Sequence, residues 1–113
     1  MRAISSIFFL TSAVAALTLQ AGPALADRID GNWCFPDGRH LTIEGPSIIT
    51  PGGTRMQGLY NRHGFEYTVP AGEADAGAEV AMIQLNQYTI QVTTTPPGAT
   101  ARSETWKRCD LTT

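Results

Sequence analysis

Apolar and polar residues alternate along most of the chain after residue 26, and turn-forming residues interrupt the alternation at short intervals. Leu41 and Ile43 fall on one face of residues 39–44, and the polar residues between them fall on the other, which is the period of a half-buried strand. Phe65, Tyr67 and Val69 repeat the pattern. The predicted strands are 29–35, 39–44, 47–50, 54–60, 63–69, 79–85, 88–93 and 103–109.

Proline and glycine separate these strands. The stretches PDG, GP, PGG and PPG are turn signals, and PAGEADAG at residues 70–77 is the longest loop before the C-terminal half. No segment after residue 26 keeps an apolar period of 3.6 residues over three helical turns. The pattern therefore predicts an all-β fold, a small antiparallel barrel or sandwich of about seven to eight short strands.

The first 26 residues have a different pattern. Arg2 is followed by a mostly apolar run and then by Ala24-Leu25-Ala26, the arrangement of a cleaved secretory signal peptide. The alternative is a transmembrane helix, but the run is short for a span, and Gly22-Pro23 interrupts it. We therefore expect residues 1–26 to be a signal peptide and residues 27–113 to form a single secreted domain without a membrane span.

Charge and the compartment narrow the classes of partner. The formal net charge is −2, and the chain has no cluster of basic residues, so nucleic acid is not an expected partner. A secretory signal without a lipid-anchored start predicts a soluble protein, either periplasmic or secreted. We expect its partner to be an envelope or extracellular protein, or a small ligand.

The chain has two cysteines, Cys34 and Cys109, near the two ends of the predicted domain. An isolated pair in an oxidising compartment normally forms a disulfide bond. The spacing excludes a CxxC redox motif, and a zinc site would have only His40 and His63 as further nitrogen ligands. The sequence predicts a disulfide that joins the first strand to the last one.

The positions of the two tryptophans are consistent with a disulfide between the first and last strands. Trp33 is one residue from Cys34 and Trp106 is three residues from Cys109, so each indole faces away from its cysteine along a strand. Both tryptophans then point into the core, and the disulfide lies outside. The chain ends would lie side by side, as in a closed up-and-down barrel; a sandwich with adjacent terminal strands is the alternative.

The stretch IDGNWCFPDGRHLTIEG resembles the G-x-W first strand of calycin barrels such as lipocalins and avidins. Gly31 and Trp33 match the motif, and residues 41–43 match the following strand more loosely. The resemblance implies a barrel and carries no ligand with it, because function depends on the site and not on the fold.

Catalytic and metal-binding motifs are weak in this sequence. Neither Ser47 nor Ser103 lies in a G-x-S-x-G motif, and a disulfide leaves no thiol nucleophile. His40 and His63 with one glutamate, Glu44 or Glu66, could bind a metal only on neighbouring strands. The acidic loop at residues 73–77 has too few oxygen ligands for calcium, so we expect a solvated loop. We expect no catalytic residues, no metal and no cofactor.

The stretch GLYNRHGFEY at residues 58–67 concentrates residue types that are common in binding sites. Aromatic residues flank Asn61 and Gly64, which suit a turn, so the stretch predicts a hairpin with Arg62 and His63 at its tip. We predict that Tyr60, Arg62, His63 and Tyr67 form a binding site.

Three classes of function remain open. The sequence favours a small secreted or periplasmic, non-catalytic binding module, either inhibitor-like or a carrier of a small ligand. The alternative is an accessory subunit of a bacterial envelope complex, and a small hydrolase is the third class. A carrier requires an apolar cavity, an accessory subunit an exposed apolar patch, and an enzyme a histidine in a cleft beside an acid.

Overall fold

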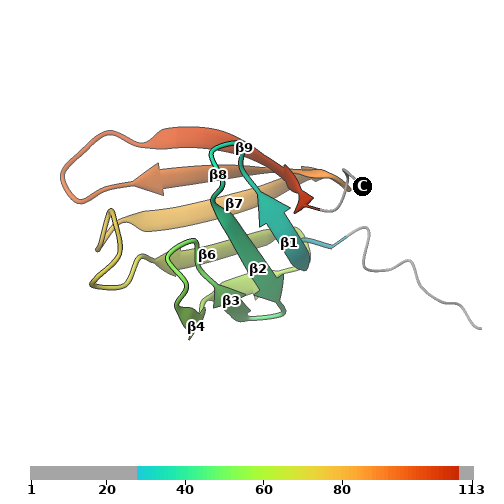
Figure 1. Cartoon of the computed structure of the whole chain (residues 1–113), viewed down its shortest axis with the longest axis horizontal. Coiled ribbons are helices and arrows are strands. Elements are labelled where there is room, and N and C mark those ends of the chain that lie inside the picture. The colour runs from blue at the N-terminus through green and yellow to red at the C-terminus, as the bar shows by residue number, and fades with distance from the viewer. Residues whose placement is uncertain (1–27, 110–113) are drawn as a thin grey trace, which may run out of the picture.

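A computed structural model describes residues 28–109 of the chain; the predicted signal peptide lies outside this range. The described part contains nine β-strands and no α-helix (Figure 1). The strands are β1 (Gly31–Cys34), β2 (His40–Glu44), β3 (Ser47–Ile49), β4 (Arg55–Gln57), β5 (Leu59–Asn61), β6 (Gly64–Thr68), β7 (Glu79–Asn86), β8 (Thr89–Thr95) and β9 (Arg102–Arg108). These bounds agree with the predicted strands to within a few residues, except at the fourth one.

The strands form one antiparallel sheet in the order β4-β3-β2-β1-β9-β8-β7-β6-β5. The first strand pairs with the last, with Trp33 opposite Arg108 and Cys34 opposite Lys107. The two strands at the ends of this order, β4 and β5, are consecutive in the chain and are separated by Gly58 alone. The sheet therefore curls into a nearly closed barrel. The prediction of a small antiparallel all-β fold is confirmed; of its two alternatives the barrel is found and not the sandwich, with nine strands instead of seven to eight.

The predicted strand 54–60 is split at Gly58 because the chain changes partners there. β4 pairs with β3, whereas β5 pairs with β6. The Gly58 N–H donates to the carbonyl of Pro46 (2.9 Å), and a Cβ on Gly58 would lie 2.5 Å from the Glu66 carbonyl oxygen. It would also lie 2.5 Å from the Phe65 ring. Only glycine lets the backbone approach both neighbours this closely.

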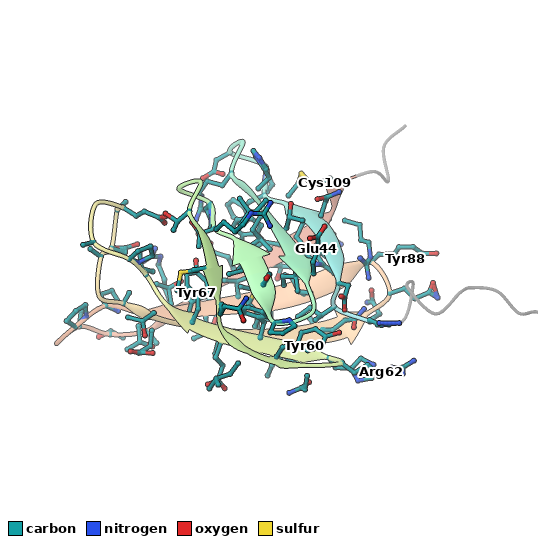
Figure 2. All side chains as sticks on the ribbon, turned by 90° about the horizontal axis from the view of Figure 1, so that it is seen from below. Glu44, Tyr60, Arg62, Tyr67, Tyr88 and Cys109 are labelled. Atoms are coloured by element: carbon teal, nitrogen blue, oxygen red, sulfur yellow. A yellow bond between two sulfur atoms is a disulfide. The ribbon has the colours of Figure 1, made fainter. Side chains whose placement is uncertain are left out.

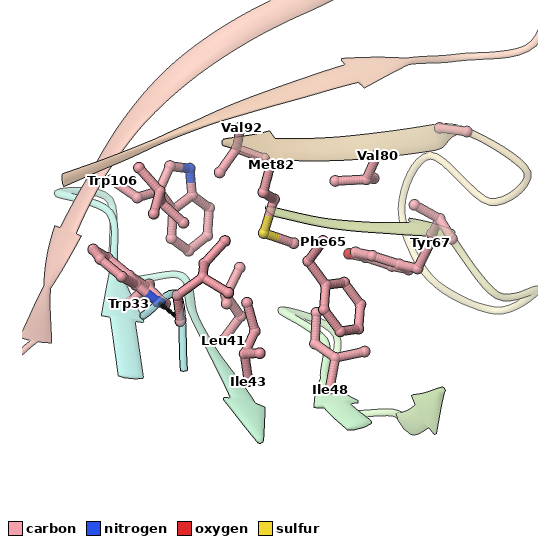
Figure 3. Packing of buried hydrophobic residues seen from close by; sticks show 14 residues of the cluster. Trp33, Leu41, Ile43, Ile48, Phe65, Tyr67, Val80, Met82, Val92 and Trp106 are labelled. Carbon is pink, nitrogen blue, oxygen red and sulfur yellow. Dashed lines mark hydrogen bonds between the residues drawn. The ribbon is translucent and has the colours of Figure 1, made fainter. Parts of the chain in front are cut away.

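Side chains from all around the sheet fill the barrel interior (Figure 3). Trp33 and Trp106 are 0% and 1% exposed, and both face the core as predicted. The Trp33 indole N–H donates to the Ile29 carbonyl (2.8 Å), so its polar atom is satisfied in the core. Ile29, which precedes β1, is also fully buried, and further fully buried core side chains come from strands around the barrel: Leu41, Ile43, Ile48, Phe65, Met82 and Ile90. The interior is a packed core.

A disulfide bond joins Cys34 to Cys109, as the sequence predicts. The Cα atoms are 5.0 Å apart, and the bridge spans 75 residues of the chain. It holds the end of β1 next to the end of β9, on the face opposite to the two tryptophans. A structural disulfide indicates an oxidising, extracytoplasmic compartment.

The barrel has two different ends. At one, which we call the sealed end, the β2–β3, β5–β6 and β7–β8 turns meet residues 28–30 and Arg108. At the other, which we call the mouth, the β3–β4 turn and the β6–β7 loop surround a pocket.

Candidate functional site

The four residues of the predicted binding site lie at two different ends of the barrel. Tyr60, Arg62 and His63 are on the β5–β6 hairpin at the sealed end. Tyr67 is further along β6, where it is buried and lines the mouth. Figure 2 shows Tyr67 and Arg62 well apart along the barrel. The fold brings the first three residues together and separates them from the fourth.

The hairpin itself has the predicted geometry. Asn61 pairs with Gly64, and the Asn61 side-chain oxygen accepts a hydrogen bond from the His63 backbone N–H (2.9 Å). Tyr60 lies opposite Phe65 in an edge-to-face contact, with 6.4 Å between the ring centroids. Arg62 and His63 therefore sit, exposed, at the tip of an ordered two-residue turn.

Tyr60 holds the N-terminal segment against the barrel. Its hydroxyl donates to one carboxylate oxygen of Asp30 (2.5 Å), and the other oxygen accepts the Gly45 N–H (2.8 Å). Burial favours a higher pKa for Asp30, but these two hydrogen bonds and the nearby Arg28 outweigh it and lower the pKa. The hydrogen bond to Asp30 raises the pKa of Tyr60. Tyr60 thus contributes to closing the sealed end.

Arg108 completes the closure of this end. Its guanidinium donates to the carbonyls of Gln87 (2.7 Å), Asp30 (2.6 Å) and Arg28 (2.7 Å). It also lies over the Trp33 ring, 4.2 Å from the centroid. Because several N–H groups lie in one planar guanidinium, Arg108 can bond the β7–β8 turn and residues 28–30 at the same time.

Large exposed apolar side chains gather beside the hairpin. Within residues 28–109 four such side chains are exposed: Leu59 (71%), Ile83 (58%), Leu85 (54%) and Tyr88 (50%). We call these four residues the apolar flank. They lie on β5, on β7 and in the β7–β8 turn, and Figure 2 shows Tyr88 at the same end of the barrel as Arg62.

Two shallow grooves run through this region. One, of about 240 Å³, lies between Leu59 and Ile83 with Gly64 between them, and both His63 and Glu66 contribute to its wall. The other, of about 390 Å³, lies between His63 and the β7–β8 turn. A backbone hydrogen bond from the Gln84 N–H to the His63 carbonyl (2.8 Å) joins the two turns. The hairpin tip and the apolar flank therefore form one continuous surface.

Gln84 is a polar residue that points inward at this end. Its side-chain oxygen is buried and has no hydrogen-bond partner in the described part of the chain. An orphan buried acceptor costs stability, because its bond to water is lost and not replaced.

The mouth is a pocket of about 180 Å³ with a mixed lining. Its apolar wall comes from inward-facing strand residues, and charged side chains stand on its rim. Tyr67 is 7% exposed, and burial, reinforced by the charge of Glu73, raises the pKa of its phenol to about 12. No described residue forms a hydrogen bond with the Tyr67 hydroxyl.

The acidic β6–β7 loop is exposed over most of its length, as expected, but its two acidic side chains are bonded to neighbours. One oxygen of Glu73 accepts hydrogen bonds from the hydroxyls of Thr50 (2.7 Å) and Thr54 (2.5 Å). Asp75, with a left-handed φ of 65°, pairs with Arg102 (2.6 Å). These partners are distant in the sequence, so no local pattern could reveal them.

An ion pair between Arg39 and Glu104 spans the rim of the mouth. The guanidinium donates to both carboxylate oxygens (3.1 and 2.8 Å) and lies over the rings of Phe35 and Trp106, 4.7 and 5.3 Å from their centroids. Hydrogen bonding to Arg39 lowers the pKa of Glu104 despite its partial burial. The two residues are 65 positions apart, and sequence reasoning did not single them out.

The histidines do not form a metal site with neighbouring acids. His40 begins β2, whereas His63 is in the β5–β6 turn at the sealed end. No group of three His, Cys, Asp or Glu side chains suited to a metal ion occurs within residues 28–109. That same part of the chain has no helix long and apolar enough to cross a membrane.

Comparisons with protein-family models, with curated proteins and with solved structures find no match for this chain.

Proposed function

We propose that this protein is a non-catalytic, protein-binding module of the periplasm or the extracellular space. Its contact surface is the apolar flank together with the hairpin tip, Arg62 and His63. One observation carries the proposal: the large exposed hydrophobic side chains of the described part gather around this hairpin. Contiguous exposed apolar side chains next to polar ones are typical of a protein interface.

The architecture supports a rigid contact surface. β7 is paired with β6 from Glu79 to Ile83 and with β8 along its length, except at Leu85, where the register shifts. Ile83 is therefore held on both sides. Asn61 orders the β5–β6 turn by a side-chain hydrogen bond, and Asn86 does the same in the β7–β8 turn. A surface that is ordered before binding loses little conformational entropy on association.

The packed interior argues against a carrier with a ligand inside the barrel. The space between the sheet walls is occupied by Trp33, Trp106, Phe65 and their neighbours. The apolar flank equally supports the alternative, an accessory subunit of a bacterial envelope complex, because such a subunit buries an apolar patch permanently. The lifetime of the complex separates a transient inhibitor from a permanent subunit.

The test is affinity capture from the envelope fraction of the source organism with the tagged full chain, followed by binding of the purified partner. Three forms are compared: the wild type, Leu59→Ser/Ile83→Ser, and Arg62→Ala/His63→Ala. Thr42→Ala/Thr95→Ala is the matched control, because both threonines lie on the outer face of the sheet, Thr42 on β2 four strands from β7 and Thr95 at the mouth end of β8.

The proposal predicts a purified partner that binds the wild type and the threonine variant equally. Its affinity for Leu59→Ser/Ile83→Ser should be at least about tenfold lower. Co-elution of the complex in gel filtration at low concentration would identify a permanent subunit. A partner that binds all forms equally would place the interface elsewhere, and the absence of any direct partner would refute the proposed function.

A further inference from the structure

The mouth has three features that together specify a ligand. The first is its size and apolar wall. Leu41, Val80, Val92 and Trp106 line a pocket of about 180 Å³. Pockets that enclose drug-sized ligands have volumes of roughly 300–1,000 Å³. The mouth therefore has room for a short aliphatic chain and not for a larger ring system.

The second feature is the Tyr67 hydroxyl. The ring is more than nine-tenths buried, and Figure 3 shows its oxygen directed toward the barrel interior. No residue within 28–109 forms a hydrogen bond with this hydroxyl, and its oxygen is not among the buried polar atoms closed off from solvent, so it is open to the pocket. A ligand in the mouth would replace solvent as its hydrogen-bond partner.

The third feature is an imbalance of charge. Two cations line the mouth, and each is paired there: Arg39 with Glu104, and Arg102 with Asp75. Glu73 also lines the mouth, but within the described residues it accepts hydrogen bonds only from hydroxyl groups and forms no ion pair. Both of those bonds go to Oε2, which leaves Oε1 without a donor from residues 28–109.

The Tyr67 hydroxyl and the Glu73 carboxylate belong to the lining of the same pocket. The charge of Glu73 is near enough to Tyr67 to affect its phenol, and both residues line one pocket. The β3–β4 turn holds Glu73 in place, because Gly52 lies directly against its side chain and leaves no room for a Cβ. A negative charge is thus fixed beside an apolar wall and a phenol hydroxyl that opens into the pocket.

We propose that the mouth binds a short alkylammonium group. The ammonium has three N–H donors and no acceptor, so it can donate to Glu73 and to the oxygen of Tyr67. Its aliphatic chain lies along the apolar wall, and the Tyr67 and Trp106 rings attract the cation further. A carboxylate would be repelled by Glu73, and a neutral alcohol would leave that charge unpaired. This site is at the opposite end of the barrel from the proposed protein interface and does not depend on it.

The probes are n-butylammonium, n-butanol and butyrate, which have similar chains and differ in charge. Each is titrated into the full chain and followed by isothermal calorimetry and by backbone amide chemical shifts. We expect saturable binding of butylammonium with a Kd on the order of 1 mM, at least about tenfold tighter than butanol. The shifts should concentrate at Tyr67, Glu73 and Val80.

Three variants test the roles of the side chains. Glu73→Gln retains an oxygen for Thr50 and Thr54 but removes the charge, and it should weaken butylammonium binding by about tenfold or more. Tyr67→Phe keeps the ring and removes the hydroxyl, and it should weaken binding severalfold. Glu66→Gln, which removes an exposed charge on the outer face of β6, should have no effect. Thermal unfolding verifies that each variant is folded.

The alkylammonium group can come from a free amine or from a lysine side chain of a protein. Nα-acetyl-lysine N-methylamide, titrated beside butylammonium, separates these sources. Tighter binding of the lysine derivative would assign the mouth to a protein side chain, and binding of butylammonium alone would assign it to a free amine. Equal or tighter binding of butanol or butyrate would overturn the proposal. So would the absence of saturable binding, or full binding by folded Glu73→Gln.

Discussion

The guanidinium of Arg108 lies 4.2 Å from the centre of the Trp33 ring, so the last residue of β9 covers the core tryptophan of β1. Gly31 makes this contact possible: with φ at 125°, a Cβ there would lie 2.5 Å from the guanidinium. The stacked guanidinium also reaches three backbone carbonyls. One side chain thereby covers the core and binds the N-terminal segment.

Replacing Arg108 should therefore destabilise the fold. Arg108→Met retains most of the apolar stem but loses three charged hydrogen bonds to carbonyls, so we expect the free energy of unfolding to fall by about 2–4 kcal/mol. Urea unfolding followed by tryptophan fluorescence measures this. Lys107→Met, an exposed neighbour on the same strand, is the control and should change stability by less than about 0.5 kcal/mol. Equal effects of the two variants would contradict the structural role of Arg108.

The disulfide should account for a large share of the stability. It closes a loop of 75 residues, and Cys34→Ala/Cys109→Ala should lower the free energy of unfolding by about 2–4 kcal/mol. Urea titration of wild type with and without reductant, beside the variant, measures this. Reductant should bring the wild type to the stability of the variant and leave the variant unchanged. A wild type that is insensitive to reductant would refute this prediction.

Gly58, which separates the end strands β4 and β5, should not tolerate a side chain. In Gly58→Ala, the new methyl group would collide with the Glu66 carbonyl and the Phe65 ring, and overpacking of this kind costs about 1–3 kcal/mol. Thermal and urea unfolding test this beside Arg55→Ala, an exposed position on β4. A stable Gly58→Ala protein would mean that β4 and β5 can move apart without loss of the core.

The phenol of Tyr67 should lose its proton at a higher pH than an ordinary tyrosine does. Its pKa in the folded protein is about 12, against an ordinary value of 10.0. Because folding raises this pKa, the neutral phenol stabilises the fold fully below about pH 10, and that contribution is lost as the pH rises toward 12. Ultraviolet titration should show a late tyrosinate step that Tyr67→Phe removes. Titration of all three tyrosines together near pH 10 would contradict the burial of Tyr67.

Replacing Gln84, whose buried side-chain oxygen has no hydrogen-bond partner in the described residues, should stabilise the fold. Gln84→Met has a similar shape without the buried unsatisfied acceptor, so we expect the free energy of unfolding to rise by about 1 kcal/mol. Differential scanning calorimetry measures the shift. Gln91→Met on the adjacent strand β8 is the control for a general effect of the substitution. A destabilised Gln84→Met protein would show that the amide has a partner in solution.

The sequence by itself determined the local features of this protein. The alternation around Leu41 and Ile43 predicted strands, because side chains of a strand alternate between two faces. The same rule, applied to Trp33 beside Cys34 and Trp106 near Cys109, predicted which residues face the core and that the disulfide joins the end strands; the structure confirms both. Asn61 and Gly64 predicted the hairpin, since turn chemistry is contained in a few consecutive residues.

Only the tertiary structure decided which distant side chains meet. The predicted strand 54–60 splits at Gly58, where the chain exchanges β3 for β6 as its partner. The glycine permits this break, but only the pairing of the two halves with different strands shows that it occurs. Arg39 meets Glu104 across 65 positions, and Glu73 meets Thr50 through the curvature of the barrel. Hydrophobic periodicity specifies which face of a strand is buried, whereas register and closure specify which neighbours share that face. For this reason the sequence separates core from surface, and the barrel alone defines the mouth and the apolar flank.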